Sequence, residues 1–187
     1  MLADLISELT SILGVPLGPD SFLSIEATDP ILDIVDDIRS DGNPWSIGDP
    51  RARGDRALGH DGESPACLQV TKPHEDSAAT ARTLMKSLAG PQPVILVGEW
   101  SDRCGGLRVP CNVALASLLE LAPYAGDPDE YSDVAVVSED VTLGLLVERF
   151  QDEVSATELL PVFRLKVWGR DWCRRAEQAL RSTPSLR

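Results

Sequence analysis

The sequence predicts an α/β fold, because short apolar runs typical of buried strands alternate with longer segments of helical periodicity. The clearest strand is at 94–97, where four consecutive apolar residues lie between turn signals. Such a run suits a strand that is buried on both faces. The clearest helix is at 2–13, where apolar side chains recur at three- and four-residue steps. A chain of 187 residues has room for one full domain and an extension.

The N-terminal third is predicted to be helical and then irregular. Asp29 and Pro30 are typical of an N-cap and a first-turn proline, so a second helix is expected at 30–40. Glycines, prolines and charged residues crowd 41–66 and predict a loop or linker with a boundary near residue 65. We therefore expect a helical N-terminal extension and linker over 1–65, followed by a domain over 66–187.

Strands and helices are predicted to alternate through that domain. Ser138 is a candidate N-cap, with two acidic residues in the first turn that follows it. The alternation indicates a layered α/β domain with crossover connections. The expected strands are at 67–70, 94–97, 134–137 and 162–167, and the expected helices are at 76–89, 111–122, 139–150 and 170–182.

The charge of the chain restricts its partners. The formal net charge is −13, which disfavours nucleic acid and anionic membranes as partners because both are bound through Lys and Arg clusters. Acidic residues are concentrated in 1–65 and 123–160, which predicts either solvated loops or a docking surface for a basic protein partner. No apolar run approaches the roughly 20 residues that span a bilayer. The start of the chain lacks the basic residues of a secretory signal, so a cytoplasmic location is expected.

Cys104 is the residue whose position suggests chemistry. The four cysteines, at 67, 104, 111 and 173, have neither C-x-x-C nor metal-ligand spacing, so no metal and no cofactor is predicted. Cys104 follows the strand at 94–97, and catalytic groups gather at the carboxyl ends of strands in open α/β sheets. The start of the helix at 111–122 and nearby arginines would stabilise a thiolate. The alternative is a thiol that packs as a small hydrophobic group.

This segment resembles the active-site segment of the thioredoxin-like superfamily. In that family a buried strand ends in a tryptophan, here Trp100, and the nucleophilic cysteine lies four residues later, here Cys104. Leu160-Pro161 is similar to the family's segment in which a cis proline faces that cysteine. The resemblance spans about 66–182 and implies a thioredoxin-like three-layer α/β/α domain. It makes Cys104 and Pro161 candidate catalytic residues and makes Trp100, Asp102, Arg103 and Leu160 candidate binding residues.

The same comparison argues against an ordinary thioredoxin cycle. Leu107 occupies the position of the family's second cysteine, and Gly98 replaces its buried aspartate. A dithiol mechanism needs a resolving thiol to expel the mixed disulfide. Cys111 could resolve only if the loop 105–110 folded it back. The first hypothesis is therefore a thioredoxin-like protein without a working dithiol site, acting as a protein-binding adaptor, assembly factor or chaperone-like module.

The second hypothesis is a single-cysteine thiol-disulfide or glutathione-linked oxidoreductase that uses Cys104 as its nucleophile. Under the first hypothesis a protein partner would bind the acidic surface or the helices at 2–13 and 30–40. The apolar faces of those helices would either cover the domain or dock on a partner. A second copy of the chain, forming a homo-oligomer, is an alternative partner for them.

Overall fold

The computed structural model describes residues 2–40, 68–71, 74–122, 131–155 and 158–182. Its described helices are α1 (Leu2–Leu13), the single 3-10 turn η1 (Pro19–Ser21), α2 (Ile25–Ser40), α4 (His74–Leu88), α5 (Ser101–Cys104), α6 (Cys111–Leu121) and α7 (Arg170–Ser182). The described strands are β1 (Leu68–Thr71), β2 (Pro93–Gly98), β3 (Leu107–Pro110), β4 (Tyr131–Ser138), β5 (Gly144–Ser155) and β6 (Glu158–Trp168). None of the described helices combines the length and apolar character needed to cross a membrane.

The six strands form one sheet in the order β1-β6-β5-β4-β2-β3, and every pair of neighbours is antiparallel. Helix α5 lies in the connection from β2 to β3, a short turn joins β4 to β5, and β6 follows β5 directly in the strand order. Helix α4 connects β1 to β2, and α6 connects β3 to β4. Each of these two connections joins strands that point the same way without being neighbours, so the predicted crossovers are present.

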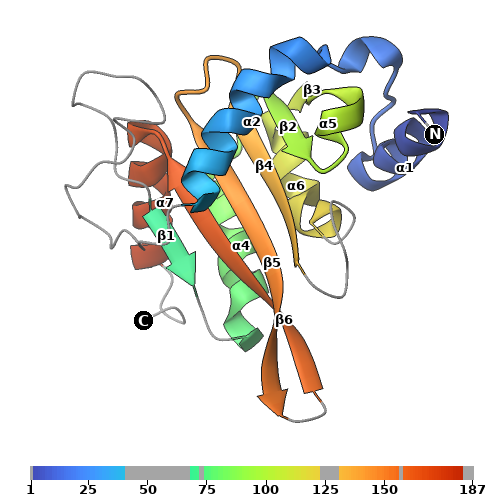
Figure 1. Ribbon diagram of the computed structural model, residues 1–187. Helices are drawn as coiled ribbons and strands as arrows, with labels where there is room; N and C mark the ends of the chain where they lie inside the picture. Colours follow the sequence, from blue (N-terminus) through green and yellow to red (C-terminus); the bar gives the residue numbers. More distant parts are fainter. Residues whose placement is uncertain (1, 41–67, 72–73, 123–130, 156–157, 183–187) are drawn as a thin grey trace.

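Helices cover both faces of the sheet and give three layers (Figure 1). Alternate residues of the central strands point to opposite faces, so Val94 and Leu96 belong to one core while Ile95 and Val97 belong to the other. The first core is shared with α1, α4, α6 and α7, and the second is shared with α2. The α/β fold expected from the alternating pattern is confirmed.

Both N-terminal helices pack on the domain. Leu9 of α1 and Val35 of α2 are buried, each in a different core. The segment between the helices reaches the edge of the sheet, where the Leu23 amide donates to the Gly106 carbonyl at 2.8 Å and the Gly106 amide donates to Thr28 Oγ1 at 2.8 Å. The apolar stripes of these helices therefore cover the domain. The linker and the boundary near residue 65 lie outside the described residues.

The second helix begins earlier than predicted. Ser24 caps it, because its side-chain oxygen accepts a hydrogen bond from the Ala27 amide at 3.2 Å. Asp29 is not the N-cap, and Pro30 lies inside the helix. The helix therefore begins after Ser24 and not after Asp29, the N-cap that Pro30 suggested.

The helix predicted at 139–150 is wrong. These residues form the turn between β4 and β5, and then the first half of β5. Ser138 and Asp140, which mimic the start of a helix, instead close that turn. The Leu143 amide donates to Ser138 Oγ at 3.0 Å, and the Thr142 amide donates to Asp140 Oδ1 at 3.2 Å. The apolar residues at 145–147 are buried alternately on the two faces of the sheet.

A cluster of charged side chains lies beneath the C-terminal end of α2. Lys166 is 3% exposed and donates to the Ile38 carbonyl at 3.1 Å and to the Arg39 carbonyl at 2.8 Å. Its Nζ is 3.4 Å from Oε2 of Glu148, which is also 3% exposed. Lys166 therefore caps the free carbonyl end of α2 and neutralises a buried carboxylate at the same time.

Candidate functional site

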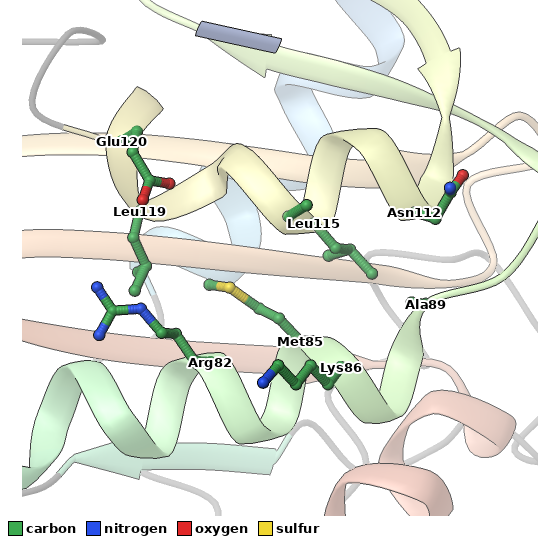
Figure 2. Close-up of a pocket in the computed structure, with 9 residues that line it drawn as sticks. Arg82, Met85, Lys86, Ala89, Asn112, Leu115, Leu119 and Glu120 are labelled. Carbon is green, nitrogen blue, oxygen red and sulfur yellow. The ribbon is translucent and has the colours of Figure 1, made fainter. Parts of the chain in front are cut away.

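A groove between α4 and α6 is a concave site in the described part of the chain (Figure 2). It has a volume of about 210 Å³. Its floor is apolar and consists of Met85, Leu115 and Leu119, whose residues are 3%, 3% and 8% exposed. The remaining lining residues are Arg82, Lys86, Ala89, Asn112, Ala116 and Glu120.

The groove exists because two small residues face it. Ala89 and Ala116 provide no side chain that could fill the space above the floor. The two helices run in opposite directions along the groove, as Figure 2 shows, with Arg82 and Glu120 near one end and Ala89 and Asn112 near the other. At that second end the Asn112 amide donates to the Gly90 carbonyl at 3.1 Å, which ties the start of α6 to the end of α4.

Charged side chains line the rim of the groove. Arg82 and Lys86 are exposed and lie one turn apart on α4, so they stand on the same side of the groove. Glu120 is exposed on the α6 side. An apolar floor beside fixed charges suits a ligand that has an apolar part and a charged part.

Cys104 lies away from this groove, at the last position of α5. It is partly exposed and is not joined in a disulfide. The next long helix, α6, begins at Cys111 as predicted, and β3 lies between Cys104 and that start. Arg108, one of the arginines expected to stabilise its thiolate, instead pairs with Glu139 at 2.8 Å. Arg108 is therefore engaged elsewhere, while Arg103 directly precedes Cys104 on α5.

The cysteine that could have resolved a mixed disulfide is out of reach. Cys111 is fully buried, and its thiol donates to the Leu88 carbonyl at 3.9 Å. Cys111 is hydrogen-bonded to Gln92 just before β2, whereas Cys104 is hydrogen-bonded to Trp100 after its end, so the five residue steps of β2, about 16 Å, lie between them. A disulfide needs Cα atoms within roughly 7 Å. Burial also raises the pKa of the Cys111 thiol, which disfavours the thiolate.

The other residues of the predicted segment have different roles. Trp100 is 7% exposed and belongs to the core below α1, α4 and α6. A Cβ atom at Gly98 would lie 2.6 Å from its ring, so glycine is needed there for the indole to pack. Asp102 and Arg103 are exposed on α5. Trp100 is therefore a packing residue, while Asp102 and Arg103 stay accessible.

Leu160 and Pro161 are not brought to Cys104. Both lie within β6, where Pro161 pairs opposite Gln151 of β5. Gly98, at the end of β2, is level with Leu165 of β6, three strands away. Pro161 is therefore displaced from Gly98 by about 14 Å across the sheet and about 13 Å along it. A cis proline at Pro161 stays a prediction, and the register of the strands does not bring this residue beside Gly98.

The other expected sites are placed only in part. The described residues contain no group of three or more His, Cys, Asp or Glu that could hold a metal ion. Cys173 is buried and donates to the Val167 carbonyl at 3.3 Å, and Cys67 lies outside the described residues. Much of the expected acidic surface, at 41–65 and 123–130, is also outside them.

No protein-family model matches the chain, and neither a curated protein nor a solved structure matches it. The thioredoxin resemblance therefore stays a prediction. The groove was not predicted from the sequence. One signal for it was available: Arg82 and Lys86 stand four residues apart on the exposed side of a predicted helix. The sequence gives no indication of which helix lies next to them.

Proposed function

We propose that this chain is a protein-binding protein that acts without a dithiol redox cycle, and that a partner docks in the groove between α4 and α6. The proposal keeps the adaptor, assembly-factor or chaperone-like role expected from the sequence. It does not depend on the thioredoxin resemblance. The observation that carries it is the groove itself, with its apolar floor and charged rim.

The size of the groove favours a protein partner over a small molecule. Pockets for small molecules usually enclose about 300–1,000 Å³. The groove offers about 210 Å³ and is only partly enclosed, which suits a single large side chain inserted from a partner surface. Binding energy at protein interfaces is concentrated in such anchors, which are held in apolar pockets and surrounded by polar residues.

The test fills the groove and leaves the fold unchanged. Ala116 is exposed on α6, so Ala116→Trp places a large ring over the floor without entering the core. Ala27→Trp is the matched control, because Ala27 is exposed on α2 at the other face of the sheet. Linear peptides selected from a random displayed library on the wild-type chain should bind Ala116→Trp at least about tenfold more weakly. They should bind Ala27→Trp as they bind the wild type. Equal binding to both variants would overturn the proposal.

A single-cysteine oxidoreductase is the alternative function, and the partial exposure of Cys104 is the observation that favours it. A nucleophilic role requires a depressed thiol pKa, which in turn requires a stabilising charge or helix start. Cys104→Ser separates the two functions. Peptide binding should be unchanged in this variant, whereas any thiol-dependent turnover of a disulfide or of glutathione would be lost.

A further inference from the structure

We infer that the partner segment is acidic and carries one large apolar anchor, with its acidic residues lying against the α4 side of the groove. This inference rests on the function proposed above and adds the chemistry of the partner. Two observations support it. The rim carries two cations without an ion pair in the described residues, and several arginines elsewhere in those residues do have acidic partners.

The two cations on the rim are not neutralised within the described residues. Arg82 and Lys86 form no ion pair or side-chain hydrogen bond there, although both are exposed beside the groove. The other side of the rim carries one acid, Glu120, at the end near Arg82. The lining residues thus have a net charge of +1 in a chain whose net charge is −13.

Several arginines elsewhere in the described residues have acidic partners, whereas Arg103 on α5 forms no ion pair there. On α7, Arg174 pairs with Asp171 at 2.6 Å and Arg181 pairs with Glu177 at 3.2 Å. At the edge of the sheet, Arg108 pairs with Glu139. The groove combines an apolar floor with two cations that the described residues leave available to carboxylates.

Electrostatic attraction favours binding of an acidic partner at the groove. The excess negative charge of the chain repels an acidic segment from most approaches, whereas Arg82 and Lys86 attract it locally. The anchor would enter over Met85 and Leu115, where Ala116 leaves space. Glu120 would repel an acidic residue at its end of the groove, which fixes the acids of the partner beside α4.

Two synthetic peptides test the inference directly. They share one tryptophan anchor, and the residues that flank it are glutamates in one peptide and lysines in the other. Binding to the full chain is followed by fluorescence anisotropy. The glutamate peptide should bind about tenfold or more tightly than the lysine peptide, and added salt should weaken it.

Charge reversal on the rim should exchange this preference. The double variant Arg82→Glu and Lys86→Glu is expected to bind the lysine peptide more tightly than the glutamate peptide. The matched control is Arg174→Glu with Arg181→Glu, which changes the net charge equally on α7, outside the groove. This control should keep the preference of the wild type. If the double variant fails to fold, the single variants Arg82→Gln and Lys86→Gln serve instead. Each should weaken binding of the glutamate peptide.

The outcomes separate the inference from the proposed function. If both peptides bind equally and Ala116→Trp weakens both, the acidic partner is wrong and the docking groove stands. If Ala116→Trp weakens neither peptide, both the partner and the groove are wrong. If decanoate binds and Ala116→Trp blocks it while neither peptide binds, the groove takes a lipid-like ligand, and both proposals are overturned.

Discussion

Replacing Lys166 by methionine should destabilise the protein strongly, because this buried side chain makes three polar contacts that methionine cannot make. Its ammonium group donates to two carbonyls at the end of α2 and lies 3.4 Å from the buried Glu148 carboxylate. Removing one partner of a buried ion pair typically costs about 3–5 kcal/mol. Arg164 remains 3.8 Å from the same carboxylate, so we expect the lower part of that range, about 3 kcal/mol.

Urea unfolding followed by circular dichroism measures this loss as a lower midpoint. Lys86→Met makes the same chemical change at an exposed position and should alter the free energy of unfolding by about 0.5 kcal/mol or less. Adding Glu148→Gln to Lys166→Met removes the carboxylate left without its closest cation. The double variant should therefore be more stable than the sum of the single effects predicts, by about 1 kcal/mol or more. A loss below about 1 kcal/mol for Lys166→Met, or strict additivity in the double variant, would refute the reasoning.

Three further predictions concern the cysteines, a glycine and the first helix. In the native protein Cys104 should be alkylated before Cys111 and Cys173, and Cys111 should react only on unfolding, because it is buried and burial raises its pKa; mass spectrometry against time measures all three. Gly105→Ala should cost about 2 kcal/mol or more, since the residue has φ +81° and its new Cβ would lie against a backbone carbonyl oxygen; an unchanged melting temperature would contradict this. Leu9→Ala should cost about 2–5 kcal/mol in urea unfolding, because Leu9 is fully buried under α1; a loss near zero would show that α1 is not part of the folded unit.

The Leu9 prediction also bears on how the chain is organised. The N-terminal residues were expected to form an extension, yet α1 and α2 bury side chains in the two different cores of the sheet. The contacts of Leu23 and Thr28 with Gly106 further join this segment to β3. A chain lacking these helices would expose apolar surface on both faces of the sheet, so partner-binding experiments should use the full chain.

Most of the secondary structure was determined by the sequence, because its signals are local. The helices at 2–13 and 170–182 have the predicted bounds, since the periodicity of their apolar residues and the breakers around them lie within each segment. The strand at 94–97 was predicted for a similar reason, because its continuous apolar run suits a position buried on both faces.

Only the tertiary structure decided the remainder. The run at 145–147 fits a helix or a central strand equally well, and pairing with β4 and β6 selected the strand. The relation of Cys104 to Pro161 depended on strand order, which no local pattern specifies. The groove likewise required two helices to lie side by side, because its lining residues come from α4 with the following Ala89 and from α6. Periodicity specifies which face of an element is apolar, whereas long-range packing determines which element covers that face.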